Sequence, residues 1–186
     1  MTIRAFVAVN LSVAATRRVV DEVEKQKPTV AALTVAWVPP ANLHLTLRFV
    51  GTIEEALIEG MVGRLKPRLK GRAPLELRAR GLGAFPSHEK PRVLWVGLDG
   101  GEPLLALQRE VEAAMVELGL AREERPFHPH LTVGRVKAQP EGASFTWSSE
   151  AELGMSQVSE IVIYESRTAE RGAEYLARAR LPLGKM

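Results

Sequence analysis

Two segments of the chain each place a histidine and a threonine two residues apart. His44 and Thr46 form the first pair, and His130 and Thr132 form the second. An imidazole with a pKa of about 6.5 accepts a proton when neutral and donates one when charged, and a hydroxyl can donate a hydrogen bond to a phosphate oxygen. Two such pairs facing each other would supply a base, an acid and two phosphate ligands, which suits in-line attack on a phosphodiester.

Each histidine and threonine pair lies in a segment where apolar and polar residues alternate. Every second residue from Leu43 to Phe49 is apolar, and Leu131 and Val133 flank Thr132 in the second copy. A period of two is typical of a strand with one buried face, and at roughly 3.3 Å per residue it places imidazole and hydroxyl on one face, about 7 Å apart. With nine threonines in the chain, one such pair arises by chance at roughly one histidine in twenty. The repeat is therefore the informative feature.

The elements that must position these pairs also occur twice. Residues 2–10 and 92–98 are rich in β-branched and aromatic residues and are predicted strands. Ser12 as an N-cap and Pro103 in a first turn each open a predicted helix, and a histidine strand follows in both cases. The repeated order predicts a duplication, and we expect residues 1–186 to form one domain of two pseudo-symmetric lobes.

The remaining sequence predicts one more helix and several more strands. Thr52 and Glu55 have the spacing of a capping box, which predicts a helix from there to about residue 70. Residues 81–86, rich in glycine, are expected to form a bend. Further strands are predicted at 34–38, 75–80, 144–152, 157–164 and 174–181.

The composition is that of an ordinary globular protein. Among 186 residues, 46% are apolar and 25% charged, and 25 cationic against 22 anionic side chains is too small an excess for binding nucleic acid by charge alone. The chain has no cysteine, which excludes disulfides, thiolate zinc sites and cysteine nucleophiles. No apolar run approaches the ~20 residues of a membrane helix, and the first residues lack a signal-peptide pattern. We expect a cytoplasmic monomer that does not enter a membrane.

Several further segments accompany the two motifs. They are RAFVAV at 4–9, NLHLTLRFVG at 42–51, GAFP at 83–86, VLWVGL at 93–98, FHPHLTVGR at 127–135 and IYES at 163–166. With these segments the chain resembles, from end to end, the RNA 2′,3′-cyclic phosphodiesterases of the 2H phosphoesterase superfamily, a group also called LigT-like proteins or 2′-5′ RNA ligases. The resemblance is weakest over residues 137–156.

The resemblance implies both a fold and a division of roles. The fold would be bilobal α+β, with two antiparallel sheets facing each other across a central cleft and helices on the outside. His44 would donate a proton to the leaving 3′ oxygen, and His130 would activate water. Thr46 and Thr132 would bind the phosphate. The substrate would be RNA or an oligonucleotide ending in a 2′,3′-cyclic phosphate, the product a 2′-phosphomonoester, and no metal or other cofactor would be needed.

Three more residues are candidates for contact with the substrate. Arg48 and Arg135 add positive charge close to the two motifs, and Phe127 could stack on a base.

Other readings use the same residues. The same histidines would serve a 2′-5′ RNA ligase or a phosphodiesterase for small cyclic nucleotides. The cleft of a non-catalytic RNA or nucleotide-binding module would also carry them. Finally, His128 and His130 share a strand face and could bind zinc, although the sequence offers no obvious third ligand.

Overall fold

The computed structural model describes residues 1–143, 145–169 and 172–184, and over these residues it contains three α-helices and nine strands. The helices are α1 (Val13–Gln26), α2 (Leu57–Leu69) and α3 (Gly101–Glu117), with short 3-10 turns η1 (Lys27–Val30) and η2 (Pro40–Asn42). The strands are β1 (Thr2–Val9), β2 (Thr34–Trp37), β3 (Leu45–Glu54), β4 (Leu75–Phe85), β5 (Val93–Asp99), β6 (His130–Ala138), β7 (Ser149–Val158), β8 (Glu160–Ala169) and β9 (Gly172–Pro182). No helix in the described part of the chain is both long and apolar enough to cross a membrane.

The strands form two halves that meet at β3 and β6. Their order is β7-β4-β5-β6-β3-β1-β8-β9, and β2 pairs with β6 beside β3. We call β1, β3, β8 and β9 the first half, and β2, β4, β5, β6 and β7 the second half. A single registered pair, Leu45 with Leu131, joins them. The expected α+β class with antiparallel pairing is confirmed, and the two expected sheets are continuous through this one contact.

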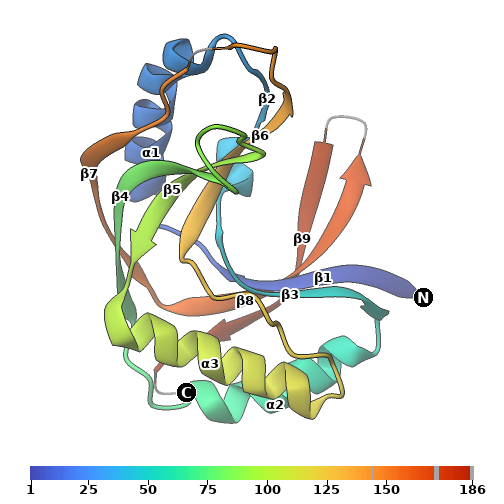
Figure 1. Ribbon diagram of the computed structural model, residues 1–186. Coiled ribbons are helices and arrows are strands. Elements are labelled where there is room, and N and C mark those ends of the chain that lie inside the picture. Colours follow the sequence, from blue (N-terminus) through green and yellow to red (C-terminus); the bar gives the residue numbers. More distant parts are fainter. Residues whose placement is uncertain (144, 170–171, 185–186) are drawn as a thin grey trace.

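The chain passes from one half to the other and back again. It forms β1, then β2 of the second half, then β3; the other strands of the second half follow, and the chain returns in β8 and β9 to the edge of β1 (Figure 1). The last hairpin therefore depends on β1, which is formed by the opposite end of the chain. We infer from this interleaving that the two halves fold as one domain.

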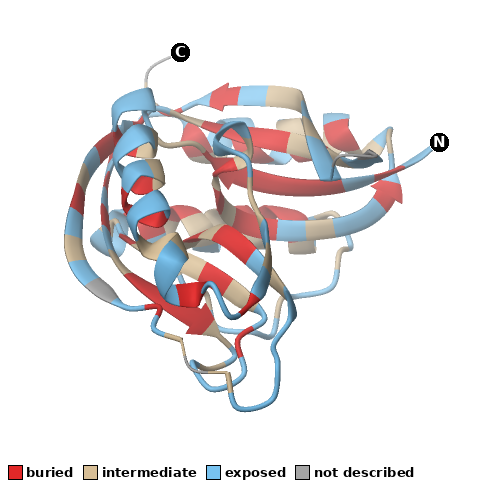
Figure 2. Ribbon diagram, turned by 90° about the horizontal axis from the view of Figure 1, so that it is seen from above, coloured by how far each residue is buried: buried red, intermediate tan, exposed pale blue. Residues whose placement is uncertain are grey.

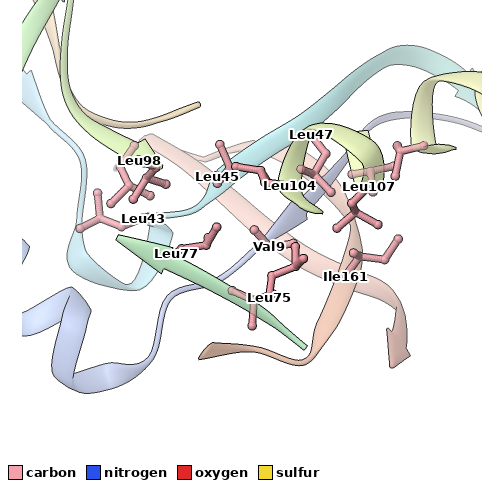
Figure 3. Packing of buried hydrophobic residues seen from close by; sticks show 14 of the residues in the cluster. Val9, Leu43, Leu45, Leu47, Leu75, Leu77, Leu98, Leu104, Leu107 and Ile161 are labelled. Carbon is pink, nitrogen blue, oxygen red and sulfur yellow. The ribbon is translucent and has the colours of Figure 1, made fainter. Parts of the chain in front are cut away.

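The buried face of the first histidine strand packs against a helix. Leu45 and Leu47 are almost fully buried and face Leu104 and Leu107 of α3 (Figure 3). Helix α3 lies beside α2 on one side of the sheet, whereas α1 packs against β7 (Figure 1). In the burial view the inward faces of the strands are buried and the outer faces of the helices exposed (Figure 2). Each leucine buried here stabilises the strand by about 1.5–3 kcal/mol relative to an exposed one.

Both histidine strands contain the same irregularity. Along β1 and β3 the register shifts so that Leu47 has no partner, and along β5 and β6 it shifts so that Val133 has none. Each extra residue is a β-bulge placed one residue after the motif threonine. A bulge reverses which face the following side chains occupy, so the simple alternation read from the sequence ends at this point in both strands.

The helix and turn predictions had mixed outcomes. The N-cap at Ser12 is confirmed, since its Oγ accepts a hydrogen bond from Ala15 N at 3.3 Å. The capping box at Thr52 is wrong: β3 continues through Glu54 because that segment pairs with the start of β1, and α2 begins at Leu57. The bend over 81–86 is also wrong. Here β4 continues to Phe85, pairing with β5, and Gly81 adopts a positive φ of 70° where the register shifts.

The strands of the tail are confirmed in number but displaced. The predicted strand at 144–152 is β7, which begins at Ser149, and residue 144 lies outside the described residues. Strands β8 and β9 extend beyond the predicted limits on the hairpin side because they pair with each other over their whole length.

Candidate active site

The four motif side chains lie around the point where the two halves join. Leu45 and Leu131 pair there and point into the core, each about 1% exposed. Their neighbours on either side therefore point to the opposite face, which is where the imidazoles and hydroxyls lie. Continuing this antiparallel register places His44 across from Thr132 and Thr46 across from His130. Each half thus supplies one imidazole and one hydroxyl to a common site.

His44 is held in one tautomer by the backbone. Its Nδ1 lies 2.8 Å from the carbonyl oxygen of Asn42. A carbonyl can only accept, so Nδ1 carries the hydrogen and neutral His44 has its lone pair on Nε2. The Thr46 hydroxyl lies 3.0 Å from that Nε2. The proton exchanged by His44 is therefore exchanged at Nε2, next to Thr46.

His130 is held in the same way by the carbonyl group two residues before it. Its Nδ1 donates to the carbonyl oxygen of His128 at 2.6 Å. The neutral ring therefore also presents its lone pair at Nε2. In both halves the carbonyl two residues before the histidine orients the imidazole, so that a local backbone contact fixes which nitrogen is available for chemistry.

The environment favours the neutral form of both histidines. Burial is the main reason that the pKa of His44 lies below its ordinary value, and the positive charges of His130 and Arg135 add to the effect. Burial also lowers the pKa of His130, helped by His128 and Arg135. The bonds to Asn42 and His128 act in the opposite direction. The effect of His130 on His44 and the shared influence of Arg135 on both imidazoles indicate that these three groups face one space.

Aromatic rings surround His44 on the first half. Phe6 stacks on the imidazole at a centroid distance of 4.8 Å, and Tyr175 meets it edge-on at 5.1 Å. Tyr164 stacks on Phe6 at 5.3 Å, and its ring lies 6.3 Å from the imidazole of His44. In the second half, Phe85 meets His130 edge-on at 5.1 Å. The two histidine motifs did not by themselves identify these rings as site residues. Alternation along residues 2–10 would have placed the ring of Phe6 on one face of its predicted strand.

A pocket of about 170 Å³ opens beside His44. Asn10, Tyr164, Tyr175 and Arg180 line it, together with the η2 turn that ends at Asn42. The Asn42 side chain donates to the carbonyl oxygen of Ala173 at 2.7 Å, which ties this turn to β9. The walls of the pocket thus come from both ends of the chain.

Of the two predicted arginines, Arg135 lies on the site and Arg48 does not. After the bulge at Val133, Arg135 is exposed and its charge acts on both imidazoles. The bulge at Leu47 has the opposite consequence for Arg48, which is turned into the interior and only 9% exposed. The expectation that Arg48 contacts substrate is wrong, because the extra residue moves it to the core face.

The buried side chain of Arg48 links β3 to other parts of the chain on the core side of the sheet. Its Nε lies 2.6 Å from a carboxylate oxygen of Glu112 on α3, and its Nη1 lies 3.8 Å from Glu123. The guanidinium also donates to the carbonyl oxygens of Phe49 and Ala121. It therefore connects the first histidine strand to α3 and to the loop that leads to the second histidine strand.

Phe49, and not Arg48, lies on the face of β3 that carries the site. The alternation in the sequence had predicted Arg48 there. The Phe49 side chain is 55% exposed, and its ring lies 6.3 Å from that of Phe6. Phe127, by contrast, packs with partial burial against the hydrophobic core. Among the described residues its ring makes no ring contact with either imidazole, so the structure gives no support for stacking of Phe127 on a substrate.

The geometry does not favour the zinc alternative. Within the described residues, no group of three or more His, Cys, Asp or Glu side chains is arranged to hold a metal ion. The imidazole of His128 is exposed and lies 6.1 Å from the ring of Phe85. The arrangement around His44 and His130 instead offers two proton-exchanging nitrogens, two hydroxyls and one cation.

Comparison with solved structures supports the fold. A crystal structure from Thermus thermophilus superposes with a TM-score of 0.84 and 27% identity, covering 97% of this chain and 98% of that one. The structure of E. coli LigT complexed with 3′-AMP superposes with a TM-score of 0.81 over 98% of this chain and 99% of that one, at 23% identity. This second likeness concerns the fold alone.

Comparison of sequences identifies the family. An RNA 2′,3′-cyclic phosphodiesterase of Methanothermobacter thermautotrophicus is 34% identical over 181 residues, covering 94% of this chain and 96% of the relative. One of Archaeoglobus fulgidus is 35% identical over 161 residues, covering 82% and 88%. The family model described as the 2′-5′ RNA ligase superfamily matches residues 12–169. The chain therefore belongs to the 2′-5′ RNA ligase superfamily.

Proposed function

We propose that this protein is an RNA 2′,3′-cyclic phosphodiesterase that hydrolyses the cyclic end to a 2′-phosphomonoester. The observation that carries the proposal is the duplicated presentation of imidazole and hydroxyl. Two bulged strands, joined at Leu45 and Leu131, each fix Nδ1 of their histidine on a backbone carbonyl and leave Nε2 facing the site. The names of the relatives agree with this activity.

In the proposed reaction the two histidines have opposite protonation states. Nε2 of neutral His130 takes a proton from water as the water oxygen attacks phosphorus. The bond from phosphorus to the 3′ oxygen breaks on the far side, and protonated His44 gives its Nε2 proton to that oxygen. The product is a 3′ hydroxyl and a 2′-phosphate, and one water is consumed.

The remaining groups hold the phosphate. The Thr46 and Thr132 hydroxyls can donate to its non-bridging oxygens, and Arg135 supplies a positive charge where negative charge gathers in the transition state. A bound anion also favours protonation of His44, whose pKa in the free protein is lowered by burial. Substrate binding thereby helps to create the acid that the reaction needs.

We propose that the protein acts as a cytoplasmic monomer without a metal ion. All the groups invoked come from one chain, the two imidazoles divide the proton transfers between them, and the absence of cysteine suits a reducing compartment.

The proposal is tested with a short RNA that ends in a 2′,3′-cyclic phosphate, incubated with the purified protein in EDTA. We expect a gain of one water by mass spectrometry and a 2′-phosphate by phosphorus NMR. The double variant His44→Ala/His130→Ala is the matched control and should be inactive. Tight binding without turnover would favour a nucleotide-binding module. Joined RNA ends would favour a ligase. Loss of activity in EDTA would favour a metal site at His128 and His130.

A further inference from the structure

The face of the first half that carries His44 extends beyond the site along β1, which lies between β3 and β8 (Figure 1). Phe6, on which His44 stacks, is separated by two residues from Arg4, nearer the start of β1. Side chains two residues apart on a strand lie on the same face, about 7 Å apart along it. Arg4 pairs in register with Thr52 of β3 and with Ser166 of β8. A row with one guanidinium between two hydroxyls therefore borders the site.

Arg4 differs from the other arginines of this half. Its neighbours Ile3 and Ala5 are buried in the core, whereas Arg4 lies on the opposite face and is exposed. The other arginines of β1, β3, β8 and β9 are held in ion pairs with carboxylates; they are Arg48, Arg167, Arg178 and Arg180. Among the described residues, Arg4 has neither an ion pair nor a side-chain hydrogen bond. Its guanidinium is therefore available to bind an anion, for which its fork of donors is well suited.

The carboxylates next to this row are neutralised or point away from it. Glu54, two residues beyond Thr52 on β3, is paired with the amino group of Met1 at 3.3 Å. Glu165, next to Ser166 on β8, is 5% exposed and lies on the opposite face, where it pairs with two arginines. An anion at the row of Arg4 would therefore meet one guanidinium and two hydroxyls.

Phe49 presents an aromatic ring between this row and the site. It pairs with Phe6 and is 55% exposed, and the bulge at Leu47 is the reason that it lies on the site face. Burying such a ring would stabilise the protein by about 1.5–3 kcal/mol, which is not gained here. A single exposed ring is common on protein surfaces, but this one lies beside both a catalytic motif and a free cation. An aromatic ring in that place can stack on the flat face of any nucleobase.

This surface has the chemistry of a site for RNA upstream of the reacting end. In the proposed reaction, the terminal ribose is bonded to the oxygen that leaves next to His44, and the RNA chain continues from the 5′ side of that ribose. We propose that Arg4, Thr52 and Ser166 bind the phosphodiester that precedes the terminal nucleotide, and that the preceding base stacks on Phe49. We call these four residues the upstream site. The preferred substrate is then an oligonucleotide end and not a mononucleoside cyclic phosphate, an inference that rests on the proposed function.

The first test compares three substrates of the wild-type protein. They are a mononucleoside 2′,3′-cyclic phosphate, a dinucleotide with the same cyclic end, and that dinucleotide with an uncharged methylphosphonate in place of its phosphodiester. We expect kcat/KM for the charged dinucleotide to be at least about tenfold above that of the mononucleotide and about fivefold above that of the uncharged dinucleotide. The inference is overturned if either ratio is close to one.

The variant Arg4→Gln locates the effect of charge. It should bring the ratio of kcat/KM between the charged and uncharged dinucleotides close to one. For a dinucleotide that ends in a 2′-phosphate, the slope of log Kd against log salt should also fall by roughly 0.7, the contribution of one phosphate contact in a single strand. Arg17→Gln is the matched control, because Arg17 is exposed on α1, which packs against β7 of the second half, and it should change neither quantity.

The variant Phe49→Ala locates the effect of the base. A dinucleotide whose first nucleotide is abasic should react several-fold more slowly than the normal dinucleotide in the wild-type protein, and this difference should disappear in Phe49→Ala. If Arg4→Gln and Phe49→Ala slow every substrate by the same factor, the mononucleotide included, the two side chains only support Phe6 and His44, and the inference is overturned.

A binding measurement separates this inference from the proposed function. We expect the dinucleotide that ends in a 2′-phosphate to bind at least about tenfold more tightly than a nucleoside 2′-monophosphate by titration calorimetry, with the difference reduced in Arg4→Gln. If no cyclic end is hydrolysed but this difference is found, the proposed function fails and the upstream site stands. If cyclic ends are hydrolysed but the two ligands bind equally, the upstream site fails and the proposed function stands.

Discussion

The half that carries His44 and the half that carries His130 share a backbone pattern. Position by position, residues 44–52 and 130–138 have the same burial pattern, and the bulge follows the motif threonine in both. In each half, the carbonyl two residues before the histidine holds its Nδ1. A repeated backbone is well suited to presenting two identical proton-exchanging groups. It cannot by itself decide which of them is the acid.

The two halves differ in the side chains that this shared backbone carries. The position after each bulge is Arg48 in the first half and Gly134 in the second, and the next is Phe49 against Arg135. The first half is thus fastened to α3 by a buried ion pair and presents an aromatic ring to the site, whereas the second half presents a cation. The comparison shows that a repeated backbone positions the two histidines in the same way. The side chains that differ between the halves can fix the orientation of the substrate.

The largest expected effect is the loss of turnover when either histidine is replaced, and a modified substrate then distinguishes the two histidines. His44→Ala and His130→Ala should each reduce turnover of the cyclic end by about 10²–10⁴-fold, as loss of a general acid or base does. A cyclic end with sulfur in place of the bridging 3′ oxygen needs no acid, because a thiolate leaves without a proton. His44→Ala should recover most of its activity on that substrate and His130→Ala should not. Recovery in His130→Ala alone would reverse the assigned roles.

The next effect concerns stability and compares the two positions after the bulges. Arg48→Met leaves Glu112 buried without its cation and should lower the free energy of unfolding by about 3–5 kcal/mol. Gly134→Ala should lower it by about 1–3 kcal/mol through overpacking, since the new Cβ would lie 2.7 Å from Val35 and 3.1 Å from Trp37. Urea denaturation measures both.

An exposed ion pair is the control for the Arg48 variant. Arg109 pairs with Glu102 on the surface of α3, with side chains 60% and 70% exposed, and Arg109→Met should cost less than about 1 kcal/mol. If Arg48→Met costs no more than Arg109→Met, the buried pair is not the anchor of the first half.

A smaller effect separates the two threonines. Thr46→Val and Thr132→Val should each slow the reaction by roughly 10–100-fold, less than loss of a histidine, because each removes one donor to the phosphate. The Thr46 hydroxyl also contacts His44 Nε2, so Thr46→Val should change the NMR titration of His44, whereas Thr132→Val should leave that of His130 nearly unchanged. If both variants react at the wild-type rate, the hydroxyls do not hold the phosphate.

The smallest effect is a displacement of the pH profile. Burial, followed by nearby positive charge, lowers the pKa of His44 and of His130. The form with one imidazole charged therefore declines before the pH reaches the ordinary histidine value of ~6.5, and the bell-shaped kcat/KM profile of the free protein should have its optimum below that pH. Bound anionic phosphate raises both pKa values, so the kcat profile should lie at higher pH. The two apparent pKa values of each profile belong to the pair of histidines and not to one histidine alone.

Arg135→Gln sharpens this prediction. Removing the cation should raise the pKa of both imidazoles, which an NMR titration measures directly, and should move the kcat/KM profile to higher pH while lowering its maximum. Arg109→Gln, far from the site on the surface of α3, should move neither pKa. An unchanged titration in Arg135→Gln would show that this cation does not face the cleft.

Much of this arrangement was determined by the sequence alone. The alternation around the two motifs placed His44 with Thr46 and His130 with Thr132 on one face of each strand, and the structure agrees. The order of strand, helix and histidine strand indicated the duplication, and Ser12 marked the start of α1. These features are local: a period of two and an N-cap depend on residues that are neighbours in sequence.

Tertiary pairing decided the rest. Whether Arg48 or Phe49 faces the site depends on a bulge, and a bulge is a property of two paired strands, which a single strand does not encode in its alternation. The same holds for Arg135, which the bulge at Val133 brings onto the site face. The aromatic pocket needs Asn10 from the start of the chain and Tyr175 from its end. Their meeting follows from the place of β8 and β9 beside β1, a long-range contact that local patterns do not specify.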